Sequence, residues 1–225
     1  MIGNLALPVA LVLFLLRIPS AQSPIPARYD GFPYGGSSGI ERTILVEAFF
    51  DPLCPDSRDS WPPLKQVLLE YYPRVSLIVH PFPLPYHDNS YVACRALHIA
   101  NMLNASATYP LLELFFQYQE KYYNGLTRNM SRASIIEEIA KDGAQAVGTS
   151  LLPAFIYAFS DTLSDSATRI SFKYGCSRGV FGTPFFFVNG FALPDAGSAI
   201  DYETWKGTID PLLGNHAQGM KAAVF

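Results

Sequence analysis

The chain is poor in charge and in cysteine, and it lacks any repeated pattern. Charged residues make up 16% of its 225 positions, the net charge is −3, and Lys and Arg form no cluster. A surface for the phosphates of a nucleic acid is therefore not expected. The 18 Pro and 16 Gly do not recur with a period, which excludes collagen-like and low-complexity proteins. Hydrophobic residues account for 49%, enough for one globular domain with a substantial core.

The first apolar run is too short to cross a bilayer. Residues 5–16 are all apolar, and Arg17 and the small-residue stretch 19–23 follow them. A membrane span needs about 20 apolar residues, whereas this pattern is typical of a cleaved secretory signal. We therefore expect a signal peptide over residues 1–23 and a mature chain that is secreted, or luminal in the secretory pathway, without stable membrane insertion. Since no Lys or Arg precedes the run, an uncleaved anchor is the alternative.

Two short motifs agree with export. Asn104 and Asn129 each begin an Asn-X-Ser triplet, which is an acceptor for glycosylation. Such triplets also arise by chance in cytosolic chains. Behind a signal peptide, they become candidate surface sites in an oxidising compartment, where cysteine pairing is allowed.

Hydrophobic patterning over the first half of the chain predicts a strand, a helix and a second strand. Residues 24–41 are rich in Gly, Pro and Ser and should form an irregular lead-in. Residues 42–50 and 75–79 are dense in apolar and β-branched side chains, as in buried strands. Between these strands, an amphipathic helical pattern stops before Pro73.

The second half of the chain changes period. Over residues 88–175, apolar side chains recur at three- and four-residue spacing, which predicts a series of amphipathic helices. Strands are expected at 185–188 and 191–193 around an Asn-Gly turn. A helix over 201–213 and a tail over 215–225 complete the chain. The predicted order is βαβ, a helical insertion and ββα.

This order resembles the thioredoxin superfamily and, within it, the DsbA-like branch. The resemblance is carried by residues 49–57 (FFDPLCPDS) and 182–190 (GTPFFFVNG), and Pro62 is similar to the proline that kinks the first helix of this superfamily. It implies an α/β, thioredoxin-like fold over residues 42–214 with the helical insertion at about 88–175. It also implies a nucleophile at Cys54.

The chemistry expected at Cys54 follows from its place at the first turn of a helix. Unpaired N–H groups and the positive end of the helix dipole stabilise a thiolate there. By the resemblance, Thr183 and a cis Pro184 lie opposite, where they would pair with the backbone of an extended substrate. Pro55 and Asp56 complete the expected substrate-binding residues.

One departure from the family pattern decides between functions. A dithiol oxidoreductase has Cys-X-X-Cys, but here Ser57 stands in place of the second cysteine. A second sulfur attacks a mixed disulfide with an effective molarity that can reach about 10⁵ M, which no free thiol in solution matches. A self-contained oxidase or reductase is therefore not expected.

Two functions remain open. The first is monothiol exchange through Cys54, of the isomerase or glutathione-linked type, on protein disulfides or small thiols. Ser57 would then donate a hydrogen bond to the thiolate, and Asp56 would oppose the thiolate by like charge. The second is a thioredoxin-like module that binds peptides or proteins without turnover. No cofactor is expected, apart from glutathione as a co-substrate.

A buried acid that many relatives carry is missing. It precedes the nucleophile by six residues and shuttles protons, and Ala48 occupies that position here. Glu47 is adjacent, but strand alternation directs it to the other face of the sheet unless a bulge intervenes.

Cys94 and Cys176 are the other two cysteines, and their state stays open. A disulfide between them would staple the helical insertion and stabilise the fold by about 4.5 kcal/mol in the chain-entropy model. Alternatively, both are separate buried thiols, as is common for cysteine. In a third arrangement, one of them resolves Cys54.

The histidines suggest no metal centre. Cys94 and His98 are four residues apart on one expected helix face, and His80 and His87 precede them. Zinc accepts these ligand types, yet the pattern has no Cys-X-X-Cys and no acidic partner. Ordinary helix and loop residues, with no metal, are therefore expected. His87 could instead lie beside the groove at Cys54.

Overall fold

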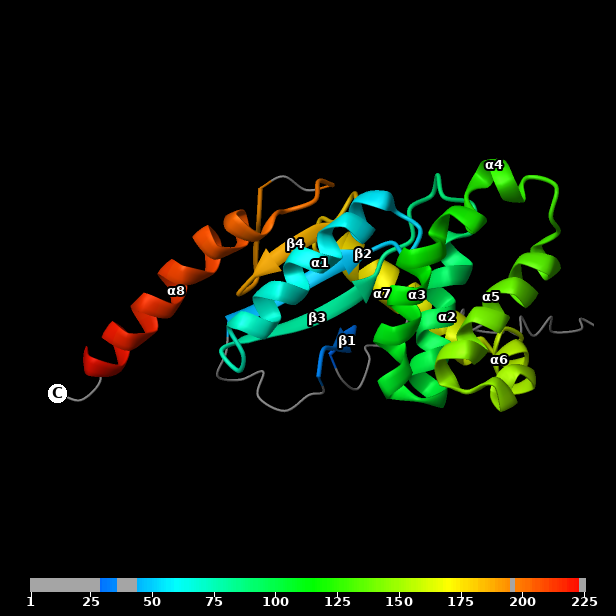
Figure 1. The fold of residues 1–225 in the computed structure, drawn as a ribbon, viewed down its shortest axis with the longest axis horizontal. Helices are drawn as coiled ribbons and strands as arrows, with labels where there is room; N and C mark the ends of the chain where they lie inside the picture. The colour runs from blue at the N-terminus through cyan, green and yellow to red at the C-terminus, as the bar shows by residue number, and fades with distance from the viewer. Residues whose placement is uncertain (1–28, 36–43, 195–196, 223–225) are drawn as a thin grey trace, which may run out of the picture.

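A five-stranded mixed sheet forms the centre of the described chain (Figure 1). The computed structural model describes residues 29–35, 44–194 and 197–222, and the side chains up to residue 214. The expected signal peptide over 1–23 lies outside the described residues, as does most of the expected lead-in. The strands are, in spatial order, β1 (Phe32–Pro33), β3 (Val75–Pro81), β2 (Ile44–Phe50), β4 (Phe185–Val188) and β5 (Phe191–Ala192). β2 and β3 pair in parallel, and the other neighbouring strands are antiparallel.

The central strand β2 has two different faces. Val46, Ala48 and Phe50 belong to the main core, which also contains buried residues of the helices α1 (Pro55–Glu70) and α8 (Tyr202–Ala222). Glu47 and Phe49 alternate with them and lie on the opposite face. The register with β3 runs without a break along β2, so no bulge turns Glu47 toward α1.

α1 follows from a helical pattern that starts at a proline. Pro55 is at the first helical position, where its missing N–H costs nothing. Trp61, Leu64 and Leu68 recur at helical spacing and are buried against the sheet. The helix continues through Pro62 and Pro63 as one element.

The helical insertion expected over residues 88–175 is present. Figure 1 shows α2, α3, α5 and α6 gathered beyond one end of the sheet, while α7 packs against β3. Its helices are α2 (Ser90–Leu103), α3 (Thr108–Tyr118), α4 (Asn124–Thr127), α5 (Arg132–Val147), α6 (Leu152–Ala158) and α7 (Thr162–Ser177). Ser131 and Asp161 cap α5 and α7 by accepting backbone N–H bonds. The α/β order predicted from the sequence is confirmed.

Two expectations about the ends of the domain were wrong. The lead-in is not wholly irregular, because Phe32 and Pro33 form β1 and pair with β3. The terminal helix does not stop at Leu213, because α8 runs to Ala222 through the expected tail. That stretch lacks an apolar stripe but contains Ala, Gln, Met and Lys, which are good helix formers. No helix in the described part of the chain combines the length and apolar character needed to cross a bilayer.

Candidate thiol site

Cys54 sits where the central strand passes into α1. It is the N-cap residue of that helix, with φ −85° and ψ 124°, and no side chain caps the helix there. Its Sγ donates a hydrogen bond to the carbonyl oxygen of Thr183 at 3.3 Å. The Thr183–Pro184 peptide bond is cis, as expected. The structure thus brings together Cys54, Thr183 and Pro184 from two distant motifs.

The hydrogen bond expected from Ser57 to Cys54 is absent. Ser57 Oγ is fully buried and has no partner among the described residues, and Thr183 Oγ1 is in the same condition. The Cys54 thiol donates its own proton to the Thr183 carbonyl oxygen, and a thiol sulfur is only a weak acceptor for the Ser57 hydroxyl. Asp56 is exposed and Pro55 is half-buried, so both border the site from the solvent side.

The sulfur is more enclosed than a free nucleophile would be. Cys54 is 4% exposed and belongs to an apolar cluster separate from the main core. The other buried members of this cluster are Phe49, Phe82, Leu84, Val180, Phe185 and Phe187. Two exposed aromatic residues border it: Phe181 packs edge-on to Phe185, and the pKa of Tyr86 is raised by partial burial and by its closeness to Cys54.

Sequence reasoning missed the role of Asp51. Its carbonyl oxygen accepts the Cys54 N–H at 3.1 Å and closes a tight turn before α1. Its carboxylate is fully buried and accepts the N–H groups of Leu53 at 2.8 Å and Leu84 at 3.1 Å. His87 Nδ1 lies 2.8 Å from the same carboxylate. His87 therefore lies beside the thiol loop, as one of the sequence hypotheses allowed, and Asp51 fixes its ring.

Gln119 ties the helical insertion to the thiol loop. This residue begins the short 3₁₀ helix Gln119–Tyr122 and is 1% exposed. Its amide nitrogen donates to the carbonyl oxygens of Pro52 at 3.1 Å and Cys54 at 3.2 Å. No signal in the sequence marks this long-range contact, because a single glutamine in an amphipathic stretch is usually a surface residue.

A buried charged network lies on the other face of β2. Glu47 is 1% exposed and accepts hydrogen bonds from Tyr174 at 2.9 Å and Arg178 at 3.3 Å. Its carboxylate is 3.5 Å from His80 Nε2, and His80 Nδ1 is 2.8 Å from Asp30. Burial alone would raise the pKa of Glu47, but the contacts with His80, Tyr174 and Arg178 lower it to about 2.

Comparison with solved structures shows the same architecture. A provisionally assigned protein-disulfide isomerase from Pseudomonas syringae aligns with a TM-score of 0.66 at 20% identity, over 80% of this chain and 98% of that one. BdbD from Bacillus subtilis aligns with a TM-score of 0.61 at 14% identity, over 81% of this chain and 98% of that one. The catalytic domain of Proteus mirabilis ScsC aligns with a TM-score of 0.59 at 20% identity, over 82% of this chain and 89% of that one. The chain has a DsbA-like thioredoxin fold. No family model and no curated protein sequence matches it.

The disulfide between Cys94 and Cys176, which the sequence left open, is not formed in this DsbA-like thioredoxin fold. All three cysteines are free. Cys94 is fully buried on α2 beside Ser90, whereas Cys176 is exposed near the end of α7. Ser171 and Gly175 face the interior, and the next residue along the helix is turned about 100° away from them. Burial, and then the charge of Asp51, raise the pKa of Cys94 well above its usual range.

The three histidines whose side chains the structure describes have protein partners rather than a shared centre. His98 Nε2 is 3.1 Å from Ser171 Oγ, and burial lowers the pKa of His98 to about 4. His80 and His87 each face a different aspartate. Among the described residues, no group of three or more His, Cys, Asp or Glu side chains is arranged to hold a metal ion.

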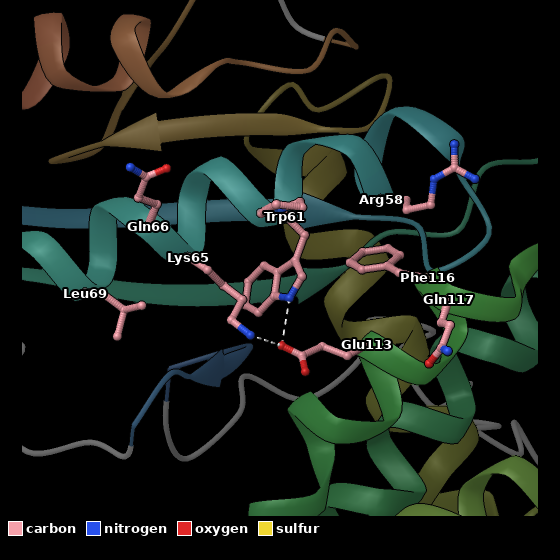
Figure 2. Close-up of a pocket in the computed structure, with 9 residues that line it drawn as sticks. Arg58, Trp61, Lys65, Gln66, Leu69, Glu113, Phe116 and Gln117 are labelled. Carbon is pink, nitrogen blue, oxygen red and sulfur yellow. Dashed lines mark hydrogen bonds and ion pairs between the residues drawn. The ribbon is translucent and has the colours of Figure 1, made fainter.

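A groove of about 560 Å³ lies between α1 and α3 of this DsbA-like fold (Figure 2). Within it, Glu113 Oε1 accepts from Trp61 Nε1 at 2.9 Å and from Lys65 Nζ at 2.7 Å. Figure 2 shows these three side chains converging between the two helices. The groove is lined by Arg58, Trp61, Pro62, Lys65, Gln66, Leu69, Glu113, Phe116 and Gln117. It does not include Cys54.

Proposed function

We propose that the protein carries out monothiol disulfide exchange through Cys54. The observation that carries this proposal is the position of its sulfur, at the N-terminus of α1 and 3.3 Å from the carbonyl oxygen that precedes cis Pro184. A helix N-terminus stabilises the thiolate that attacks a disulfide. The segment at Thr183 and Pro184 would hold the backbone of a protein substrate beside it.

The absence of a second sulfur in the motif dictates the course of the reaction. The Cys54 thiolate attacks one sulfur of a disulfide, forms a mixed disulfide with it and expels the other sulfur as a thiolate. Because Ser57 cannot attack this mixed disulfide, a second thiol must do so, either from the protein substrate or from glutathione. The first route isomerises a substrate disulfide. In the second route, one glutathione attacks the Cys54 sulfur and releases the reduced substrate, and a further glutathione releases the Cys54 thiol and leaves as glutathione disulfide. Pro55 and Asp56 would border the incoming chain.

The proteins with similar structures support this class of chemistry. They include the provisionally assigned protein-disulfide isomerase from Pseudomonas syringae and a thioredoxin-like oxidoreductase from Silicibacter pomeroyi, which aligns at a TM-score of 0.57. At 20% and 19% identity, these likenesses concern the fold. The chemistry is inferred from the position of Cys54.

The test is formation of the mixed disulfide and its turnover. Incubation with glutathione disulfide, followed by peptide mass mapping, should place glutathione on Cys54 faster than on the exposed Cys176 of the same molecule. The Cys176→Ser protein should catalyse reduction of insulin by glutathione, and the Cys54→Ser protein should not. Equal rates for these two variants would refute the proposal.

A second candidate function is favoured by one observation, the 4% exposure of Cys54. An enclosed sulfur in an apolar cluster bordered by Phe181 and Tyr86, which are 77% and 61% exposed, suits a module that binds extended peptides without reacting. Under this alternative, wild type and Cys54→Ser would bind a cysteine-free unfolded peptide equally, and neither would catalyse exchange. Phe181→Ser would weaken the binding.

We infer that the chain is exported, on the sequence of residues 1–23. A periplasmic thioredoxin-like protein from Salmonella enterica serovar Typhimurium, aligned at a TM-score of 0.58 and 20% identity, supports this inference. Asn104 and Asn129 are both exposed, as glycosylation requires. Expression in a secreting eukaryotic host should yield a protein cleaved near residue 23, whose mass falls on treatment with an N-glycosidase. An uncleaved, unglycosylated product would contradict export.

A further inference from the structure

Two residues next to Cys54 carry buried hydroxyl groups that have no partner among the described residues. Ser57 is 0% and Thr183 is 3% exposed. Ser57 is the third residue of α1, one helical turn after the N-cap residue Cys54. Thr183 is the residue whose carbonyl oxygen contacts Sγ. A buried hydroxyl without a hydrogen bond costs about 1 to 3 kcal/mol, so an acceptor formed beside Cys54 would be stabilised if both hydroxyl groups turned toward it.

The thiol itself cannot be that acceptor. Thiol sulfur accepts hydrogen bonds weakly, and neither hydroxyl contacts it within hydrogen-bond distance in the structure. An oxygen atom bonded to the sulfur would differ, because a sulfenate oxygen carries negative charge and accepts strongly. We propose that Cys54 reacts with hydrogen peroxide and that Ser57 and Thr183 donate hydrogen bonds to the oxygen of the resulting sulfenate.

The enclosure of the sulfur selects for a small oxidant. Cys54 is 4% exposed within a cluster of aromatic and aliphatic side chains, so a large disulfide reaches it only if the loop moves. Hydrogen peroxide is little larger than water and needs no such movement. The other two cysteines are the buried Cys94 on α2 and the exposed Cys176 on α7, and neither is bonded to Cys54. The sulfenate is therefore expected to persist until an external thiol arrives.

The reaction balances with reagents of two classes, a peroxide and a small thiol. The Cys54 thiolate attacks one oxygen of hydrogen peroxide, an S–O bond forms, and the O–O bond breaks to release hydroxide, which takes a proton to become water. The sulfur is oxidised by two electrons and the peroxide is reduced. A small thiol then displaces water from the protonated sulfenic acid to give a mixed disulfide. A second thiol molecule releases the Cys54 thiol and leaves with the first as a disulfide.

The test traps the sulfenic acid in the full chain. The folded protein is treated with hydrogen peroxide for timed intervals, the peroxide is removed with catalase, the chain is unfolded in urea that contains dimedone, and the rate of labelling at each cysteine is measured by peptide mass mapping. Cys54 should label faster than Cys176, although Cys176 is the more exposed. Equal labelling of the two, or labelling of Cys176 alone, would overturn the proposal.

Substitutions of the two hydroxyl residues separate sulfenate binding from simple reactivity. Ser57→Ala and Thr183→Val should each slow labelling of Cys54 about tenfold, as expected for loss of one hydrogen bond to a charged group, and Thr183→Ser should retain the wild-type rate. Ser60→Ala is the matched control, because Ser60 is buried in the same helix but donates to the Asp56 carbonyl oxygen. Wild-type labelling rates in Ser57→Ala and Thr183→Val would refute the assignment.

This proposal does not depend on disulfide exchange. Labelling by dimedone reports only the step with peroxide, whereas the glutathione disulfide assay contains no peroxide. A protein that labels at Cys54 but does not exchange would retain this inference and lose the proposed function. A protein that catalyses disulfide exchange but is not labelled by dimedone at Cys54 would retain the proposed function and lose this inference.

Discussion

Asp51 is the residue on which the geometry of the thiol loop depends most. Its buried carboxylate accepts two backbone N–H groups and faces the ring of His87. Removal of the carboxylate would leave these donors buried without an acceptor, at about 1 to 3 kcal/mol for each group that water cannot reach. The same turn positions Cys54 through its N–H bond to the Asp51 carbonyl oxygen.

We therefore expect Asp51→Ala to lower the free energy of unfolding by about 3 kcal/mol. Urea denaturation followed by circular dichroism measures this quantity. Asp56→Ala is the matched control, because Asp56 is exposed in the same region and surface changes cost less than about 0.5 kcal/mol. Similar losses in both variants would show that the carboxylate of Asp51 has no special role.

Cys94 and Cys176 should differ sharply in reactivity in the folded protein. Cys176 is exposed, whereas Cys94 is fully buried and burial raises the pKa of its thiol well above the usual range. Iodoacetamide at neutral pH should therefore modify Cys176 and leave Cys94 intact, since alkylation requires an accessible thiolate. Mass mapping after a timed quench measures this. In urea, all three cysteines should react at comparable rates, and fast labelling of Cys94 before unfolding would contradict the buried position.

At the scale of single residues, the sequence predicts what short motifs contain and misses what distant contacts create. Cys54, Thr183 and Pro184 were predicted because each stands in a local motif with a known geometry. The partners of Asp51 and Gln119 come from other loops, which no local pattern reveals. The position of Ser57 predicts a hydrogen bond to Cys54 that the structure does not contain, because the sulfur of a protonated thiol is a weak acceptor.

At the scale of elements, α7 packs unusually closely on the sheet at Gly175. A Cβ atom at this position would lie 2.6 Å from the Phe82 ring and 3.3 Å from the Phe49 ring. Both rings belong to the apolar cluster around Cys54 and are buried, so neither can move aside easily. The glycine is therefore required by packing, although glycine weakens a helix by about 1 kcal/mol relative to alanine.

Gly175→Ala should destabilise the protein by about 1 to 2 kcal/mol, because the overpacking exceeds the gain in helix propensity. Gly207→Ala in α8 is the matched control, since a Cβ there meets no atom within 4 Å, and it should stabilise the protein by up to about 1 kcal/mol. Thermal unfolding of the two variants beside wild type measures both effects. A gain in stability from Gly175→Ala would show that α7 lies farther from the sheet than the structure places it.

Strong periodicity explains which elements the sequence predicts. The strands β2 and β4 and the long helices of the insertion have clear apolar patterns, and all were found near their expected positions. β1 has only two residues, one of them Pro33, and it exists because β3 offers a free edge. The end of α8 depends on helix propensity rather than on a buried face, so an apolar pattern could not locate it.

At the scale of the whole molecule, one buried charged network joins four parts of the chain. Asp30 comes from the N-terminal segment, Glu47 from β2, His80 from β3 and Arg178 from the residue after α7. Burial opposes protonation of His80, but the hydrogen bond with Asp30 and the contact with Glu47 outweigh it and raise the pKa of His80. The ring therefore lies between two carboxylates that favour its protonated form, on the face of the sheet opposite α1.

These shifts predict a stability maximum in mildly acidic solution. Because the pKa of His80 is raised above 6.5, its contribution is complete below pH 6.5 and is lost as the pH rises through the folded value. Because the pKa of Glu47 is lowered from 4.5 to about 2, its contribution is complete above pH 4.5 and is lost as the pH falls toward 2. Both contributions are therefore complete between pH 4.5 and pH 6.5.

The two limbs of this profile can be assigned by substitution. Urea unfolding of wild type across the pH range should show a decline on each side of the maximum, and the acid limb should amount to about 3 kcal/mol from Glu47. His80→Gln should flatten the alkaline limb whatever its overall stability, since a glutamine does not titrate, and Glu47→Gln should flatten the acid limb. Glu138→Gln, which breaks an exposed pair with Lys141, should leave the shape unchanged. If stability still declines at alkaline pH in His80→Gln, another group causes that decline, and a charge on the His80 ring does not stabilise the network.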